Sequence, residues 1–262
     1  MSYIWNASKY KSASNLQANI GQELLNYIQI SEDDCILDAG CGIGNFTMEI
    51  ASIAQKGYVV GIDSSASMIN KCIETMGEVD IRNVEFINMS LTDIIYENKF
   101  DIIFSNSVLH WIKDIEKALN AFSRALKPSG YMAVQFPLLN LSHPLIYFTN
   151  KVINNLNLNE YYKAWDNPWY APEEEDFKLL LVSQGFNNIN ICKKQSFFKF
   201  NSVKEAYEFF DSIGLQLFLS NLNQEKRDLF IEEFIKSLQE VSSKDYIELK
   251  FERIFAFATK NK

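Results

Sequence analysis

The sequence predicts an α/β fold: a Rossmann-like, doubly wound, seven-stranded sheet, mostly parallel with an antiparallel edge strand, plus a helical cap. Three observations lead to this prediction. Between residues 35 and 136, short apolar runs alternate with helix-length amphipathic segments, the order that builds parallel sheets covered by helices. The runs are almost continuously apolar, which is typical of strands buried on both faces. The first run ends in a bend that holds Gly40, Gly42 and Gly44.

The central elements follow from these patterns in chain order. The segments 45–54, 65–76 and 113–126 have helical spacing, and the last is expected to end at "KPSG", where Pro128 and Gly130 supply a stop and a turn. Five runs predict strands: "CILDA" (35–39), "YVVGID" (58–63), "VEFIN" (84–88), "FDIIFSN" (100–106) and "YMAVQFP" (131–137).

The outer parts of the chain predict further helices around the sheet. The N-terminal stretch of about 15–29 repeats apolar residues at helical spacing. Residues 138–220 are rich in aromatics, with five in "YYKAWDNPWYAP" alone, and we expect them to form a mainly helical cap. A helix is expected to open at Pro172, where three glutamates favour the positive end of its dipole. Two more helices are expected at 203–219 and 223–240, and the runs "NINIC" and "IELKFERIFAFAT" around them predict closing strands, antiparallel to one another at the sheet edge.

Length and charge exclude several classes of function. With 262 residues, 47% of them hydrophobic, the chain can bury the core of a single domain spanning 1–262. It holds 33 acidic and 25 basic residues, and the basic ones are dispersed, so nucleic acid is not an expected partner. No apolar run is long enough to span a membrane, and the first residues lack a signal-peptide pattern. A small-molecule partner and a monomer or weak homodimer are expected.

Cysteine and histidine usage predicts the compartment and argues against a metal site. The four cysteines are scattered, as is typical of free thiols in a reducing, cytoplasmic environment. The two histidines, His110 and His143, are too few and too far apart for a histidine-based metal centre. We therefore expect no metal.

The glycine bend predicts a ligand that lies directly against the main chain. Glycine tolerates positive φ and has no Cβ, and the helix that follows the bend directs its first amides at a ligand. Asp63 follows Gly44 by 63 − 44 = 19 residues and ends the second strand, where an acid binds ribose hydroxyls. Asp38 stands just before the glycines; a carboxylate there suits an ammonium group and would repel a pyrophosphate. These features indicate a nucleoside that carries an amino acid, although tight packing without a ligand is the alternative.

Four motifs in order resemble those of class I S-adenosylmethionine-dependent methyltransferases. "ILDAGCGIGNFT" and "VVGIDSSASMI" resemble the family's first two motifs, while "FDIIFSNSVLHWI" and "ALKPSGYMAVQFP" resemble its fourth and fifth strands, so the match covers about 30–137. The resemblance implies S-adenosyl-L-methionine as methyl donor and S-adenosyl-L-homocysteine as product. It places the methionine end against Asp38 and the glycines, the ribose at Asp63, and adenine beside a serine where many members have aspartate. The implied cofactor residues are Asp38, Gly40, Cys41, Gly42, Gly44, Asp63, Ser64, Met68, Ser90, Leu91 and Asn106.

The outer segments resemble enzymes that methylate carboxylates. "WNASKY", "KSASNLQ" and "SIGLQLFLSNL" are similar to the trans-aconitate methyltransferase group. "SNSVLHW" resembles plant carboxyl methyltransferases and juvenile hormone acid methyltransferase, in which a Gln and a Trp hold the carboxylate. "NLQ" also resembles the malonyl carrier-protein methyltransferases. The resemblance implies that Gln17 and Trp111 hold the carboxylate, with Tyr10 nearby, as catalytic and substrate-binding residues. His110 is a further catalytic candidate, as a base, and Trp165 and Trp169 of the aromatic-rich segment are candidates for substrate binding. Residues 1–30 are expected to lie over the cofactor site.

A carboxylate acceptor fits neutral hydrogen-bond donors of this kind. A carboxylic acid with a pKa near 4 is already ionised at neutral pH, so it needs no general base. We expect O-methylation of a small carboxylic acid to a methyl ester. Three alternatives stay open: C- or N-methylation with His110 as base, methylation of a malonyl carrier protein, and a cofactor-binding subunit without catalysis. Trp111 or His110 could also serve packing alone, and Gln17 could contact only the cofactor.

Overall fold

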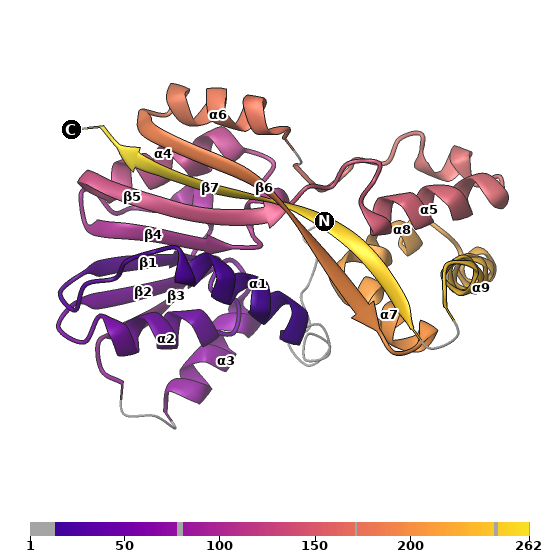
Figure 1. The fold of residues 1–262 in the computed structure, drawn as a ribbon, viewed down its shortest axis with the longest axis horizontal. Coiled ribbons are helices and arrows are strands. Elements are labelled where there is room, and N and C mark those ends of the chain that lie inside the picture. Colours follow the sequence, from indigo (N-terminus) through magenta and orange to yellow (C-terminus); the bar gives the residue numbers. More distant parts are fainter. Residues whose placement is uncertain (1–13, 78–80, 171, 244–245, 262) are drawn as a thin grey trace.

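The seven strands form a single sheet with helices on both faces (Figure 1). The structure, a computed structural model, describes residues 14–77, 81–170, 172–243 and 246–261, with side chains from residue 19 onward. The strand order is β3-β2-β1-β4-β5-β7-β6, which confirms the predicted class. The strands are β1 (Cys35–Ala39), β2 (Tyr58–Asp63), β3 (Val84–Asn88), β4 (Phe100–Asn106), β5 (Leu126–Pro137), β6 (Phe186–Phe200) and β7 (Ile247–Lys260).

The strand order reverses between β1 and β4, and this reversal positions the site. β1 pairs in parallel with β2 on one side and with β4 on the other. Their connections leave in opposite directions, which opens a crevice at the carboxyl ends of the two strands. β7 is antiparallel to both β5 and β6, as predicted for the closing pair, and it lies one position in from the edge that β6 forms.

Alternating side chains of the strands build two cores, one on each face of the sheet. Ile36 packs with the cluster that includes residues of α1 (Ser14–Asn26), α2 (Asn45–Ile53) and α3 (Ala66–Met76). The next residue, Leu37, packs with the opposite cluster, which includes residues of α4 (Ile115–Ala125) and α6 (Glu174–Ser183). This alternation follows from the pleat of a strand, where successive side chains point to opposite faces, and it explains the apolar runs.

The second half of β6 and the first half of β7 leave the parallel sheet and carry a smaller helical lobe, seen on the right of Figure 1. We refer to this lobe as the cap. Its α5 packs against α9, and α7 packs against both α9 and β6. A helical path broken at Gly214 (φ 147°) connects α7 to α8. The helices are α5 (Pro144–Asn155), α7 (Val203–Phe210), α8 (Gln216–Leu219) and α9 (Gln224–Glu240), with short helical turns at Asn159–Tyr162 and Asp211–Leu215.

The cap predicted at 138–220 differs from the lobe that the structure shows in its middle and beyond its C-terminal end. α6 and the first half of β6 fall inside that range, yet they pack against the parallel sheet, where Phe177 and Leu181 are fully buried. α9 falls outside the range and lies in the cap, where Phe230 and Phe234 are fully buried. The physical reason is that β6 and β7 are long enough to belong to both lobes.

The strand at 131–137 begins earlier than predicted. α4 ends at Ala125, and β5 starts at Leu126, which pairs with Phe100. The register shifts before Tyr131 pairs with Ile102, and Ser129 has φ 66°. "KPSG" therefore forms an irregularity inside the strand, as in a β-bulge, and not the separate turn that the Pro and Gly pattern predicted.

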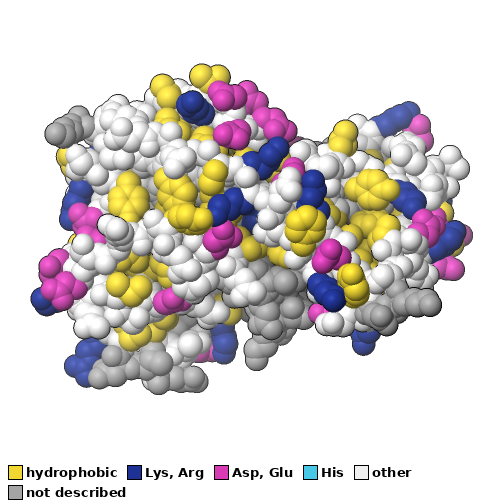
Figure 2. All heavy atoms as spheres, viewed as in Figure 1, with side chains coloured by type: hydrophobic (Ala, Val, Ile, Leu, Met, Phe, Trp, Pro, Cys, Tyr) yellow, Lys and Arg dark blue, Asp and Glu magenta, His cyan; other side chains and the backbone are white. Residues whose placement is uncertain are grey.

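The surface is mixed in charge on the face shown in Figure 2, where Lys and Arg side chains lie among Asp and Glu side chains. Several ion pairs join exposed groups of opposite sign, such as Lys56 with Glu32 and Lys71 with Glu74. Within the described residues, no helix has the length and apolar character that crossing a membrane requires.

Candidate active site

A cavity of about 210 Å³ opens at the carboxyl ends of β1, β2 and β4 and extends toward the cap. Most of the residues that the sequence singles out line it. On the sheet side these are Gly40, Gly42, Asp63, Ser64, Met68, Ser90, Leu91 and Asn106, and toward the cap they are His110, Trp111 and Trp169.

Six predicted site residues do not line this cavity or have side chains outside the described part of the chain. Asp38, Cys41, Gly44 and Trp165 are absent from its lining. Tyr10 lies outside the described residues. Gln17 lies within α1, but its side chain is likewise outside the described part of the chain, so its proposed role stays a prediction.

The three glycines of the bend occupy two different kinds of surroundings. All have positive φ, at 86° for Gly40, 54° for Gly42 and 83° for Gly44. A Cβ on Gly40 would lie 2.2 Å from Val108, and one on Gly44 would lie 2.8 Å from Phe86. A Cβ on Gly42 would meet nothing within 4 Å among the described atoms. Gly42 is thus the position where the main chain is bare toward the cavity, whereas Gly44 serves close packing.

Asp63 ends β2 and supports the bend directly. Its Oδ2 accepts a hydrogen bond of 3.0 Å from the backbone N–H of Gly42, and its Oδ1 accepts one of 2.8 Å from Ser65. Burial raises the pKa of Asp63, while these two backbone hydrogen bonds oppose the rise. Each carboxylate oxygen retains acceptor capacity for a ligand hydroxyl, which fits the predicted contact with ribose.

Asp38 lies beneath the bend, and its predicted contact with the methionine end stays a prediction. The side chain is 2% exposed, and its Oδ2 accepts a hydrogen bond of 2.6 Å from Thr47 Oγ1 in α2. Burial raises the pKa of Asp38 to about 7, the Thr47 hydrogen bond opposes this, and the Asp63 carboxylate adds to it. The structure therefore shows Asp38 joining β1 to α2 beneath the ligand-facing backbone.

Ser90, which the resemblance places beside adenine, stabilises the start of a short helix. Its Oγ accepts a hydrogen bond of 3.3 Å from the backbone N–H of Thr92 and so caps the short helix Leu91–Asp93. Asp93, three residues on, is paired with Lys117 at 3.2 Å and does not line the cavity. The hydrogen bond from Thr92 to Ser90 thus fixes the position of Leu91, which is buried and lines the cavity.

His110 and Trp111 lie on the short helix Leu109–Trp111, directly after β4. The Trp111 ring lies 5.1 Å from the His110 ring and 5.7 Å from the Trp169 ring, measured between centroids. His110 is 7% exposed, and its Nδ1 has no hydrogen-bond partner within the described structure. Burial lowers the pKa of His110 well below its usual value, and the nearby charge of Arg253 adds to the effect. His110 is therefore neutral at neutral pH.

Trp165 packs inside the cap and does not face the cavity. Its ring lies 4.6 Å from the Phe218 ring and 6.0 Å from the Tyr162 ring, measured between centroids. It also contacts Trp169 at 6.1 Å. Of the two tryptophans predicted from the aromatic segment, Trp169 lines the cavity and Trp165 supports it from behind.

A polar network that no sequence motif predicted joins Arg253, Ser107 and Asn106 of the cavity lining through the buried Gln135. Arg253 of β7 donates from Nε to Gln135 Oε1 and from Nη2 to Ser107 Oγ, both at 2.6 Å. Gln135 donates in turn to Ser107 Oγ at 2.7 Å and to Asn106 Oδ1. A signal was available: in 247–255 the odd positions are apolar except Arg253, so a charge lies on the apolar face of the strand.

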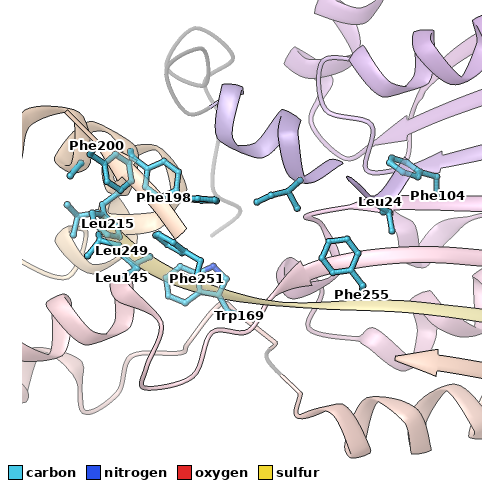
Figure 3. Close-up of a cluster of buried hydrophobic side chains, with 14 of the residues drawn as sticks. Leu24, Phe104, Leu145, Trp169, Phe198, Phe200, Leu215, Leu249, Phe251 and Phe255 are labelled. Carbon is cyan, nitrogen blue, oxygen red and sulfur yellow. The ribbon is translucent and has the colours of Figure 1, made fainter. Parts of the chain in front are cut away.

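The cap contributes an apolar wall, of which the aromatic-rich segment predicted only Trp169. We name it the apolar chamber and define it by Leu145, Trp169, Phe198, Phe209, Ile213 and Phe251, all of which line the cavity. Figure 3 shows Phe198, Phe251 and Trp169 gathered beside the cap helices, with Phe104, Leu24 and Phe255 over the parallel strands. The six residues of the apolar chamber come from five separate stretches of the chain, so only the tertiary fold brings them together.

The residues present fit a nucleoside with an amino-acid end. Bare backbone at Gly42, an acid that ends β2 and apolar contacts from Met68 and Leu91 occur on one side of a single cavity. The other side continues to Trp111 and the chamber. A cofactor and a second molecule can thus meet in one enclosed space.

Comparisons with known proteins agree with this geometry. A family described as "Methyltransferase domain" matches residues 30–168, which is more than half of the chain. Protein 235L of Invertebrate iridescent virus 6, a methyltransferase by its name, is 27% identical over 240 residues, covering 88% of this chain and 84% of the relative. Trans-aconitate 2-methyltransferase of Escherichia coli O157:H7 (strain EC4115 / EHEC) is 23% identical over 262 residues, covering 97% of each chain.

Solved structures show the same fold. Loganic acid methyltransferase with S-adenosylhomocysteine has a TM-score of 0.65 at 12% identity, covering 98% of this chain and 94% of that one. The family match, the sheet order and the cavity at its switch point agree. The chain therefore belongs to the methyltransferase-domain family and is a class I S-adenosylmethionine-dependent methyltransferase.

Proposed function

We propose that this methyltransferase acts on the carboxylate of a small acid and forms its methyl ester. The observation that carries the proposal is the lining of one cavity by the glycine bend, by the indole of Trp111 and by the guanidinium of Arg253. A cation and a neutral N–H donor suit an anionic acceptor. Two relatives are named for acids, trans-aconitate 2-methyltransferase and loganic acid methyltransferase, which supports the same acceptor class.

The cofactor would be held by the sheet side of the cavity. Asp63 would accept hydrogen bonds from the ribose hydroxyls, the backbone around Gly42 would lie against the methionine end, and Met68 and Leu91 would flank the adenosine. When bound, S-adenosylmethionine supplies an electrophilic methyl group on a sulfonium. Asp38 acts indirectly, because it ties β1 to α2 through Thr47 and so fixes the bend.

The residues on the acceptor side of the cavity need to orient a carboxylate oxygen of the acceptor toward the methyl group and to exclude water. A carboxylate oxygen would be the nucleophile toward the methyl group that the cofactor would supply, and the electron pair of the broken carbon–sulfur bond would stay on sulfur. No proton is released, so no base is required. Trp111 would hold the acceptor through its indole N–H, and Gln17 is predicted to add an amide N–H. Holding the reactants in line can account for roughly 7–11 kcal/mol of the barrier.

The environment of His110 supports a second candidate function, the C- or N-methylation of a small molecule. It lines the cavity, its Nδ1 has no partner within the described structure, and its lowered pKa keeps the imidazole in the neutral form that a base needs. The same lowered pKa makes that base weak. A carboxylate acceptor, which needs no base, therefore fits this environment better.

Proton counting with an acceptor panel separates the two candidates. Methyl transfer from labelled cofactor would be measured for carboxylic acids, amines, thiols and activated carbon acids at pH 7.5 in weak buffer with a pH indicator. We expect base-labile methyl esters from acids and no proton release per turnover. Labelled products from amines or carbon acids only, with one proton released per methyl group, would show that the acceptor class is wrong.

The variant Trp111→Phe tests the predicted hydrogen bond from the Trp111 indole N–H to the acceptor carboxylate. The ring stays apolar and aromatic while the N–H donor is lost, so we expect kcat/KM for acids to fall about 10- to 100-fold, with cofactor affinity by calorimetry changed less than threefold. Trp165→Phe makes the same chemical change behind the cavity and should leave kcat/KM nearly unchanged. Equal kinetics for both variants would exclude hydrogen bonding by the Trp111 indole.

A further inference from the structure

The position of Arg253 in the cavity indicates which part of an acceptor it meets. Arg253 is 7% exposed and lines the cavity between the cofactor side and the apolar chamber. Among the described lining residues, Asp63 and Arg253 are the two charged side chains. Since Asp63 belongs to the cofactor side, the remaining charge of the cavity is positive and lies next to the acceptor space.

The guanidinium is held in a fixed orientation. Nε donates to Gln135 Oε1 and Nη2 to Ser107 Oγ, each at 2.6 Å, and Gln135 is fully buried. Ser107 has φ 62°, a backbone conformation that a serine adopts at some cost and that often marks a functional site. The network sets the plane of the guanidinium before a ligand arrives, which reduces the entropy lost on binding.

Arg253 is the cation among the described residues of this region, because the neighbouring imidazoles of His110 and His143 are uncharged. Burial lowers the pKa of His143 to about 3 and that of His110 well below its usual range, and Arg253 contributes to both shifts. Both histidines are therefore neutral at neutral pH. A carboxylate in this region gains a direct charge partner at Arg253, and polar but uncharged neighbours at the two rings.

Beyond Arg253 the cavity is suited to an apolar group. The Phe198 and Phe251 rings stack at 4.6 Å, and Phe209 lies 5.8 Å from Phe198 and 5.7 Å from Phe251, measured between centroids. The chamber contains no charged side chain among its six residues. A second carboxylate placed there would lose its hydration without an ionic partner, whereas a hydrocarbon or aromatic group would be stabilised by burial.

We propose that Arg253 binds the carboxylate head of the acceptor and that the apolar chamber takes its tail, so that the acceptor is a monocarboxylic acid with an apolar body. This inference rests on the proposed function and names its substrate class. It differs from what the name of trans-aconitate 2-methyltransferase would suggest, because that acceptor carries three carboxylates. A head held by Arg253 and Trp111 also leaves one carboxylate oxygen available for methyl transfer.

Binding to the protein saturated with S-adenosylhomocysteine tests the inference without requiring turnover. Octanoate, phenylacetate, octanamide and trans-aconitate would be titrated by calorimetry. We expect octanoate and phenylacetate to bind at least tenfold more tightly than trans-aconitate. Arg253→Gln should weaken octanoate at least 30-fold and leave octanamide within threefold. Lys250→Gln removes one exposed positive charge from the same strand and should change neither affinity.

The outcomes separate this inference from the proposed function. Octanoate binding that depends on Arg253 without ester formation would support the binding mode and refute the ester chemistry. Ester formation with equal octanoate affinity in Arg253→Gln would refute the role of Arg253, and tighter binding of trans-aconitate than of octanoate would refute the apolar tail. If Arg253→Gln loses cofactor binding, the variant Ile213→Trp provides the test, because its larger side chain fills the apolar chamber. It should weaken the binding of octanoate at least tenfold and leave the binding of acetate unchanged. An equal loss of affinity for octanoate and acetate would overturn the inference.

Discussion

At the scale of single residues, two glycines of the bend have different roles, Gly44 in close packing and Gly42 in the approach of a ligand. Gly42 and Gly44 both have positive φ, but a Cβ on Gly44 would lie 2.8 Å from Phe86, and one on Gly42 would meet no described atom within 4 Å. A side chain at either position pays roughly 1–2 kcal/mol for the backbone conformation. At Gly44 the clash adds roughly 1–3 kcal/mol, while at Gly42 the added methyl group occupies ligand space.

Gly42→Ala and Gly44→Ala are therefore a matched pair. We expect Gly42→Ala to lower the free energy of unfolding by about 1–2 kcal/mol and to weaken S-adenosylhomocysteine binding more than 30-fold. Gly44→Ala should lose more stability, about 2–4 kcal/mol, with a smaller change in affinity where it remains folded. Urea denaturation and calorimetry measure the two effects. The assignment of Gly42 to ligand approach would be wrong if its variant bound the cofactor product normally.

Asp63 is the second residue whose loss should act on the cofactor. Its two oxygens already accept backbone hydrogen bonds from Gly42 and Ser65, so Asp63→Ala removes a ribose acceptor and also loosens the bend. We expect cofactor affinity to fall at least 100-fold by calorimetry. Asp93→Ala, at an exposed carboxylate paired with Lys117, should leave affinity within threefold. Retained binding in Asp63→Ala would contradict the ribose assignment.

The sequence could predict residues of the site where backbone geometry dictates the residue type. Gly42 and Asp63 belong to this group, since a bare turn and an acid ending the next strand follow from local spacing. Asp38, Gly44 and Trp165 do not line the cavity, and the sequence could not show this because a buried or packed position and a ligand-facing one have the same local pattern. Arg253 joins the site from β7, almost 150 residues along the chain from Ser107, and pairing across such a separation is not encoded locally.

At the scale of elements, the parallel strands were the most predictable part. β1 to β4 begin and end at the predicted residues, because strands buried on both faces must be continuously apolar. β7 matches its predicted run within one residue, whereas β6 extends well beyond "NINIC", since its second half pairs only with the first half of β7 and exposes one face. There the burial of β6 alternates between exposed and partly buried positions, a pattern that also fits loops.

The kink at Gly214 shapes the apolar chamber and gives an element-scale prediction. With φ 147°, Gly214 brings its backbone against Trp169, and a Cβ there would lie 2.7 Å from Trp169 Cζ2 and 3.3 Å from Leu145. We expect Gly214→Ala to lower the free energy of unfolding by about 2–4 kcal/mol and to reduce kcat/KM for the acceptor while cofactor affinity is kept.

Gly185→Ala is the control for that kink. Gly185 also has positive φ, at 82°, but a Cβ there would come no nearer than 3.7 Å to the nearest described atom, Ser123 Oγ. The substitution costs backbone strain of roughly 1–2 kcal/mol without a clash, and it lies outside the cavity. Urea denaturation and tryptophan fluorescence compare the two variants. Equal losses of stability would show that contact with Trp169 does not determine the requirement for glycine at 214.

At the scale of the whole molecule, several buried ionisable groups couple folding to pH in opposite directions. The folded-state pKa of His143 is about 3, against about 6.5 when unfolded. Between these values the unfolded state binds more protons, so stability rises with pH. His110 acts in the same direction. Asp38, whose pKa is raised to about 7, binds its proton in the folded state and makes stability fall as pH rises from about 4 to 7.

A comparison of wild type with His143→Phe isolates one of these contributions. From pH 7.5 to 5, His143 should destabilise the wild-type fold by about 2 kcal/mol, because protonation favours the unfolded state by about 1.4 kcal/mol per pH unit below 6.5. Phenylalanine keeps an aromatic ring beside Phe251, which lies 5.3 Å from the His143 ring, and cannot titrate. The variant should therefore lose about 2 kcal/mol less than wild type over this interval in urea denaturation, while above pH 7.5 the two pH dependences should run parallel. Identical losses from pH 7.5 to 5 would mean that His143 becomes protonated within the folded protein, and that the region beside Arg253 is open to water.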